Sequence, residues 1–179
     1  MLKFLRPAPR MRLLMVCLGN LCRSPMAQIV TLQLAQQAGF GAAIEVNSAG
    51  TNAARGSPSP DPRARKVLAG HSYPVPDLRA KRIIEPDFQR YDLILAMDQA
   101  NMNDLRALCP AEHSHKLRLL LEFAPNSGTL DIPDPYYGNL QSFERVLDLV
   151  EFGARVDGHT GDCRYGPSTR SPSWSPRTG

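Results

Sequence analysis

The sequence predicts an α/β domain with three layers, in which a central four-stranded parallel sheet is flanked by helices. Short apolar runs alternate along the chain with segments of helical periodicity, which indicates strand–helix–strand units. The apolar runs lack polar alternation, as is typical of strands buried on both faces. A polar loop follows the first run, at the carboxyl end of a predicted strand, where ligands bind in such folds.

The first strand is predicted over residues 11–17, where "MRLLMVC" is mainly apolar. Ser24 is expected to cap the next helix, because Pro25 follows it at the position where proline is favoured. Gly39 is expected to end this helix. Its apolar residues recur at helical spacing at Ala27, Val30, Leu34 and Ala38. The tight loop between strand and helix therefore runs from Cys17 to Arg23.

The second strand is predicted in "AIEVNSAG", ending near Ser48, and a loop rich in Gly, Pro and Ser follows over residues 51–60. Asp61 and Asp98 are residues of the kind that caps helices, so helices are predicted over 61–70 and 99–109.

The remaining predicted elements are strands within 91–97 and 116–123 and a last helix over 140–152. This helix has one apolar face, formed by Phe143, Val146, Leu147 and Val150.

The length of 179 residues suits one domain, which we expect over residues 11–153 after an N-terminal extension of residues 1–10. From residue 154 to residue 179 the chain has almost no aliphatic side chains, and Gly, Ser, Pro and Arg dominate. Such a segment buries too little apolar surface to offset its ordering entropy, so we expect an atypical, disordered tail.

The composition argues against several classes of function. The net charge of +4 comes without a dense Lys/Arg run and with few aromatic residues, which favours an anionic substrate over nucleic acid. No apolar run approaches the length that spans a bilayer, and the basic, proline-broken start does not predict a signal peptide. The four cysteines lack zinc-like spacing, so we expect free thiols in the reducing cytoplasm.

The segment "VCLGNLCRSP", residues 16–25, has the composition of an anion-binding loop. Backbone N–H groups between a strand and a helix N-terminus bind anions, aided by the helix dipole. Gly19 permits a tight turn, and Asn20 tolerates the left-handed conformation. Arg23 can grip two phosphate oxygens. The same positive field would stabilise a thiolate at Cys17, although a buried cysteine is more often a packing residue.

The stretch "VCLGNLCRSPMAQ" resembles the signature of the low-molecular-weight protein tyrosine phosphatases, and "IPDPYYGN", residues 132–139, resembles the late acidic loop of that family. The segments "NSAGT", "DPRA", "YDLILAMDQAN" and "FERVLDLVE" are also similar to it, so the resemblance covers Met11 to Glu151. It implies a monomeric enzyme that needs no cofactor and acts on phosphotyrosyl proteins or peptides, among which a tyrosine kinase is a candidate.

The resemblance also implies a catalytic role for three residues. Cys17 would attack phosphorus and form a cysteinyl-phosphate intermediate, which water then hydrolyses. Asp134 would protonate the leaving phenolate and later take a proton from the water; without the cysteine loop, it would be interpreted as part of an Asp-Pro turn. The phosphate would be held by Arg23 and by the loop before it, Leu18, Gly19, Asn20, Leu21 and Cys22.

Four polar residues match the network that supports the phosphate-binding loop in this family. Ser24 matches the hydroxyl that hydrogen-bonds the nucleophilic sulfur, and Asn20, Ser48 and His71 match groups that hold the loop in shape. His71 is assigned by its spacing, nine residues before Ala80. Taken alone, it would be interpreted as a loop or core histidine.

Substrate recognition is where the sequence departs from the family. A bulky residue often stands six positions after Ser48 as one wall of the phenol pocket, and here that position holds Ala54. Tyr136 would form the opposite wall by ring stacking, with Tyr137 next to it. We therefore expect weaker or broader recognition of aryl phosphates.

Related functions on the same scaffold stay open. Phosphoarginine phosphatases tend to carry threonine where this chain has Leu21, which favours an aryl phosphate here. Arsenate reductases need two further cysteines near the middle of the chain, where this sequence has Cys109 alone. A phosphotyrosine-binding module without turnover would need neither Cys17 nor Asp134.

Two further features have alternative interpretations. Cys22 can pair with Cys17 under oxidation and so protect the nucleophile, or it can be a packing residue of the loop. The segment "EHSH" offers Glu112, His113 and His115 to a metal ion, but a solvated turn is favoured and no metal is expected.

Overall fold

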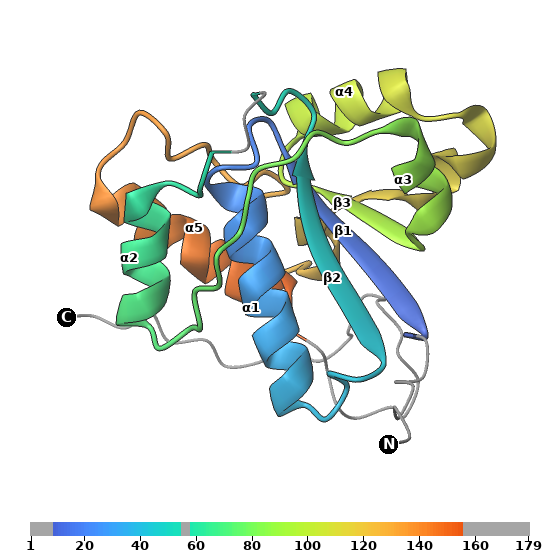
Figure 1. Ribbon diagram of the computed structural model, residues 1–179. Coiled ribbons are helices and arrows are strands. Elements are labelled where there is room, and N and C mark those ends of the chain that lie inside the picture. The colour runs from blue at the N-terminus through green and yellow to red at the C-terminus, as the bar shows by residue number, and fades with distance from the viewer. Residues whose placement is uncertain (1–8, 55–57, 156–179) are drawn as a thin grey trace.

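The computed structural model describes residues 9–54 and 58–155, so most of the predicted extension and tail lies outside the described residues (Figure 1). Four parallel strands form one sheet with the order β2-β1-β3-β4, and the predicted four-stranded parallel sheet is confirmed. The strands are β1 (Met11–Cys17), β2 (Ile44–Gly50), β3 (Leu93–Ala96) and β4 (Leu117–Leu119).

Helices cover both faces of the sheet and complete the three predicted layers (Figure 1). One face carries α1 (Arg23–Gln37), α2 (Pro62–Gly70) and α5 (Leu140–Gly153). The other carries α3 (Glu85–Arg90) and α4 (Gln99–Leu108). Two 3₁₀ turns, η1 (Ala111–Lys116) and η2 (Leu120–Phe123), flank β4. No helix in the described ranges is long and apolar enough to cross a membrane.

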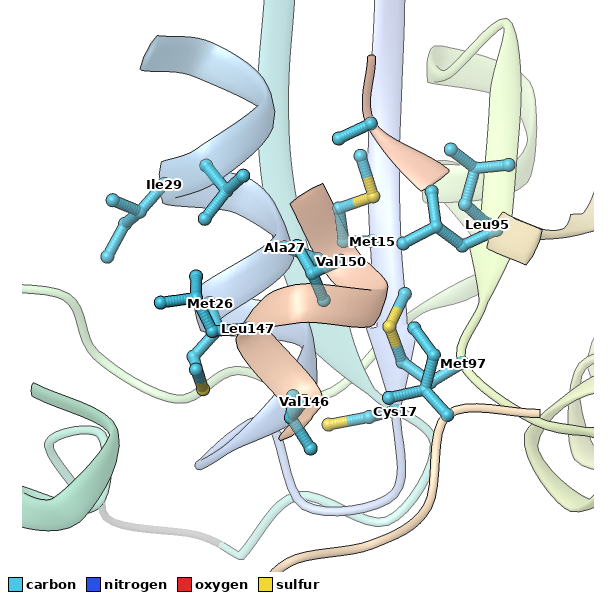
Figure 2. Packing of buried hydrophobic residues seen from close by; sticks show 14 of the residues in the cluster. Met15, Cys17, Met26, Ala27, Ile29, Leu95, Met97, Val146, Leu147 and Val150 are labelled. Atoms are coloured by element: carbon cyan, nitrogen blue, oxygen red, sulfur yellow. The ribbon is translucent and has the colours of Figure 1, made fainter. Parts of the chain in front are cut away.

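The central strand β1 is buried on both faces, as its sequence predicts. Met15 and Cys17 belong to the apolar cluster between the sheet and α1, α2 and α5, where Figure 2 shows Met15 near Val150 and Cys17 near Val146 of α5. Leu14 and Val16 belong to the second cluster, against α3 and α4. Because successive side chains point to opposite faces, this alternation places Cys17 at the carboxyl end of β1 with its side chain toward α1 and α5.

Several boundaries differ from the prediction. Helix α1 begins at Arg23, its capping position is Cys22, and Ser24 lies inside the first turn, so the prediction of Ser24 as the cap is wrong. The reason is that the Ser24 hydroxyl bonds within the loop network described below. Strand β2 continues past Ser48 to Gly50, α3 was not predicted, and β4 has three residues because the chain turns into η2.

Two caps and the last helix agree with the prediction. The carboxylate of Asp61 accepts a hydrogen bond from the backbone N–H of Arg63, and that of Asp98 accepts one from Asn101. Helix α5 buries the predicted apolar face and ends at Gly153, where a Cβ atom would lie 2.9 Å from Cγ of Leu120. Ala154 is fully buried, so the apolar core continues one residue beyond the predicted domain end.

Candidate active site

The carbonyl groups of the loop between β1 and α1 accept hydrogen bonds from neighbouring segments. Backbone N–H groups of two later segments donate to it at 2.9 Å: Thr51 to Cys17, Asn52 to Leu18, and Asp61 to Leu21. The N–H groups of residues 18–22 donate to no backbone carbonyl of the described residues. They are therefore available to an anion at the N-terminus of α1.

Asn20 fixes the shape of this loop. Its φ of 55° places it in the left-handed region, as predicted. Its side-chain Nδ2 donates to the hydroxyl oxygens of Ser24 (2.9 Å) and Ser48 (3.0 Å), and its Oδ1 accepts from the backbone N–H of Lys81 (2.9 Å). Ser48 in turn donates to Oε1 of Gln28 at 2.7 Å. The structure thus brings together three of the four residues predicted for the network.

The glycine that the loop requires is Gly50 rather than Gly19. A Cβ atom on Gly50 would lie 2.6 Å from the carbonyl oxygen of Leu18, because the end of β2 passes directly against the loop. A Cβ atom on Gly19 would meet its nearest neighbour, the side chain of Leu21, at an ordinary 3.8 Å. The expected tight turn at Gly19 is therefore made by the left-handed Asn20 instead.

The nucleophile predicted at Cys17 lies under this network. Its Sγ is 3.0 Å from Oγ of Ser24, close enough for either atom to donate a hydrogen bond. Ser24 also donates to the carbonyl oxygen of Ala49 at 3.1 Å. A thiolate at Cys17 would accept from Ser24, so the hydroxyl can stabilise negative charge on the sulfur.

Arg23 is buried and points at two carboxylates. Its Nη2 donates to Asp134 at 2.6 Å, and its Nη1 donates to Asp98 and, at 3.0 Å, to the carbonyl oxygen of Ile132. Burial would lower the pKa of Arg23, but the hydrogen bond to Asp98 and the charge of Asp134 raise it overall. The guanidinium therefore stays charged and joins the phosphate-binding loop to the loop of Asp134.

Asp98 is a site residue that the sequence interpretation assigned only to helix capping. One of its carboxylate oxygens caps α4, and the other accepts the hydrogen bond from Arg23. The available signal was its position directly after an apolar run: β3 pairs with β1, so the carboxyl ends of the two strands meet at one edge of the sheet.

A cavity of about 250 Å³ lies in front of the loop. Its lining includes the three predicted catalytic residues, Cys17, Arg23 and Asp134. The other lining residues are Leu18, Gly19, Leu21, Cys22, Asn52, Tyr136 and Tyr137. The two tyrosine rings meet edge to face, with centroids 5.0 Å apart. Ala54 is exposed and does not line this cavity; Asn52, which was not predicted, does.

His71 does not join the network to which it was assigned. It is exposed at the C-terminal end of α2, and its Nε2 lies 2.8 Å from a carboxylate oxygen of Glu144 on α5. The assignment from spacing is therefore corrected. The side-chain oxygen of Asn20 accepts its hydrogen bond from the backbone N–H of Lys81 and not from His71.

The structure also shows the surroundings of Cys22, Cys109 and the "EHSH" segment. Cys22 is a buried free thiol; burial and the charge of Asp61 raise its pKa to about 12. Cys109 is a free thiol outside the cavity. Glu112 and His113 lie in η1, and the described residues contain no group of three or more side chains that could hold a metal ion.

A nucleophilic cysteine and an arginine on one anion-binding loop, faced by an aspartate from another loop, define the class of phosphatases with a cysteine nucleophile. The comparisons agree. The family model described as low molecular weight phosphotyrosine protein phosphatase matches residues 12–156.

The low-molecular-weight protein-tyrosine-phosphatase of Streptomyces coelicolor is 42% identical over 143 residues, which cover 78% of this chain and 87% of that protein. A solved structure of a low-molecular-weight phosphotyrosine phosphatase from Vibrio cholerae has 40% identity and a TM-score of 0.76, covering 80% of this chain and 92% of that one. A protein tyrosine phosphatase from Entamoeba histolytica has 36% identity and a TM-score of 0.77, with the same coverage. The chain belongs to the low-molecular-weight phosphotyrosine protein phosphatase family.

Proposed function

We propose that the chain is a protein tyrosine phosphatase that hydrolyses aryl phosphate monoesters through a cysteinyl-phosphate intermediate. One observation carries the proposal: the sulfur of Cys17, the guanidinium of Arg23 and the carboxylate of Asp134 line the same cavity. A binding module would need the cationic loop but neither a nucleophile nor an acid at its mouth.

In the first step, the thiolate of Cys17 attacks phosphorus while the phosphate oxygens are held by the loop amides and Arg23. The bond from phosphorus to the phenol oxygen breaks, and the phenolate takes the proton of Asp134. A phosphate dianion competes with Asp134 for the donors of Arg23, so that substrate binding would release the carboxyl group toward the leaving oxygen. In the second step, water attacks phosphorus, Asp134 takes the water proton, and Cys17 leaves as a thiolate that accepts a hydrogen bond from Ser24.

Phosphotyrosyl proteins or peptides are the proposed substrates, with a tyrosine kinase among the candidates, and the enzyme is proposed to act as a monomer. Tyr136 and Tyr137 supply the aromatic wall of the cavity, and Leu21 supplies an apolar one, which suits a phenol ring better than the guanidinium of a phosphoarginine. The proposed location is the cytoplasm, because the mechanism requires Cys17 as a free thiol.

Phosphate release from a phosphotyrosyl peptide at mildly acidic pH tests the proposal. Cys17→Ser should abolish release, and Asp134→Asn should lower it by about 10²- to 10⁴-fold, the usual range for a general acid. Retained release in folded Cys17→Ser protein would overturn the proposed nucleophile. Binding of the peptide without release by the wild-type chain would favour a binding module.

A further inference from the structure

The loop that carries Asp134 is held on both sides of the aspartate. On the upstream side, the backbone N–H of Ile132 donates to the carbonyl oxygen of Met97 at 2.8 Å, and the carboxylate of Asp131 accepts from the N–H of Gln99 at 2.9 Å. These contacts fasten the loop to the segment between β3 and α4.

The downstream side depends on one side chain of another element. Arg63, in the first turn of α2, donates from Nη2 to the carbonyl oxygen of Tyr136 at 2.9 Å and from Nη1 to that of Gly138 at 2.8 Å. The backbone N–H of Tyr136 donates to Oδ1 of Asp134 at 3.1 Å, and that of Gly138 donates to the carbonyl oxygen of Pro135 at 2.8 Å. Fixing the carbonyl groups of Tyr136 and Gly138 therefore restrains the two residues whose own N–H groups bond to Asp134 and Pro135 within this loop.

The same guanidinium is anchored to the phosphate-binding loop. Its Nε donates to Oδ1 of Asp61 at 3.0 Å and its Nη2 donates to Oδ2 at 2.8 Å, while the backbone N–H of Asp61 donates to the carbonyl oxygen of Leu21 at 2.9 Å. The guanidinium carbon lies 4.7 Å from the ring centroid of Phe143, a fully buried residue of α5. Arg63 thus connects the loop of Cys17 with the loop of Asp134, and its guanidinium stacks on the buried ring of Phe143.

We propose that Arg63 is a positioning residue that holds the loop of Asp134 and Tyr136 over the phosphate-binding loop. The inference rests on the proposed function, because it assigns to Asp134 the role of general acid. Arginine is suited to this task, since its planar fork can satisfy a carboxylate and two carbonyl oxygens at once, whereas the three donors of a lysine ammonium group all lie on one nitrogen and cannot span these acceptors.

Arg63→Ala and Arg63→Lys test the proposal, with Arg65→Ala as the matched control. Arg65 lies two residues further along α2, is exposed, and makes no side-chain hydrogen bond or ion pair with the described residues. The measured quantity is kcat/KM, which reports formation of the intermediate, for phenyl phosphate and for p-nitrophenyl phosphate. A general acid matters more for phenol, the poorer leaving group.

We expect the ratio of the two kcat/KM values, phenyl over p-nitrophenyl, to fall at least tenfold in both Arg63 variants and to stay unchanged in Arg65→Ala. In Asp134→Asn the ratio should already be low, and adding Arg63→Ala should lower it no further. Equal losses for both substrates would mean that Arg63 has only a structural role, and would overturn the proposal.

Two controls separate the possible failures. Thermal unfolding shows whether a variant is folded, and Arg63→Lys, which keeps the charge, provides the test if Arg63→Ala does not fold. If wild-type protein releases phosphate from both substrates and the ratio is unchanged in the Arg63 variants, the positioning role fails while the proposed function stands. If release persists in Cys17→Ser, the proposed function fails and the role of Arg63 fails with it.

Discussion

The sulfur of Cys17 and the hydroxyl of Ser24 lie 3.0 Å apart, and that hydroxyl has a single hydrogen for two acceptors, the sulfur and the carbonyl oxygen of Ala49. Asn20 donates to the same hydroxyl oxygen, which leaves its hydrogen free to turn. When the sulfur is a thiolate, the charged acceptor forms the stronger hydrogen bond. Ser24 therefore stabilises Cys17 most in the states where the sulfur carries charge.

Ser24→Ala should slow the departure of Cys17 from the intermediate. A hydrogen bond to a charged group contributes about 1.5–3 kcal/mol, so kcat should fall about 10- to 100-fold. Stopped-flow measurement with p-nitrophenyl phosphate should show a burst approaching one product per enzyme, as the phosphorylated enzyme accumulates. An unchanged kcat would show that Ser24 acts only in the loop network.

Asp98 has two functions that two substitutions separate. Asp98→Asn keeps an acceptor for the cap of α4 but removes the negative charge beside Arg23, whereas Asp98→Ala removes both. Both variants should bind inorganic phosphate at least tenfold more weakly, measured as the inhibition constant, because Arg23 loses the partner that orients it. Urea unfolding should show Asp98→Ala less stable than Asp98→Asn by about 1 kcal/mol, the usual value of a cap. Equal stability of the two would rule out the capping role.

The pKa of about 12 makes Cys22 a thiol at neutral pH and controls how fast it can protect Cys17. Oxidised Cys17 is attacked by the thiolate form of Cys22, and below the pKa the thiolate fraction rises tenfold with each pH unit. After brief peroxide treatment, the Cys17–Cys22 disulfide should therefore form about ten times faster at pH 8 than at pH 7. Peptide mass spectrometry measures the rate, with Cys22→Ser as the control. A rate independent of pH would contradict attack by a buried thiol.

His71 should be dispensable for catalysis. Its contact with Glu144 is exposed, and such pairs stabilise by about 0–1 kcal/mol. His71→Ala should therefore leave kcat and KM within about twofold and lower the free energy of unfolding by less than about 1 kcal/mol. Ser48→Ala, which removes a partner of Asn20, is the contrasting variant and should lower kcat. A loss in His71→Ala as large as that in Ser48→Ala would restore His71 to the loop network.

The exposed Ala54 offers a test of substrate recognition. It lies two residues beyond Asn52, which lines the cavity. A tryptophan at this position would add an aromatic wall, and an aromatic pair contributes about 0.5–1.5 kcal/mol. Ala54→Trp should therefore lower KM for a phosphotyrosyl peptide about 2- to 10-fold and leave inhibition by inorganic phosphate unchanged. An unchanged KM for the peptide would remove Ala54 from the account of specificity.

Local signals in the sequence were sufficient for most of the fold. The apolar run of β1 reads as a buried strand because both of its faces are covered, and Asp61 and Asp98 predicted their helices because capping depends on neighbouring backbone groups. Helix α3 was missed because its six residues are too few to show periodicity. Ser24 does not cap α1 because its hydroxyl bonds to Cys17, Asn20 and Ala49 instead of to the N–H groups of the helix.

In the candidate site too, the sequence predicts contacts within one segment but not contacts between segments that are distant in sequence. Cys17, Arg23 and Asn20 share one loop, so their proximity follows from the sequence alone. Contacts between separate loops do not: the bonds from Arg63 to Tyr136 and from Arg23 to Asp98 span more than seventy residues. The assignment of His71 relied on spacing along the chain, which does not encode where the turn after α2 lies relative to β1.

Cys17 is the last residue of β1 and also a member of the apolar cluster that α1 and α5 build on one face of the sheet (Figure 2). The active site and the hydrophobic core therefore share the Cys17 side chain. On one side, this side chain belongs to the same cluster as the methionine, valine and leucine side chains that stabilise the domain. Enlarging or shrinking a side chain such as Val146 would move the nucleophile as well as loosen the core. Selection for turnover and selection for folding thus act on the same few aliphatic positions, and variants that adapt one property will tend to alter the other.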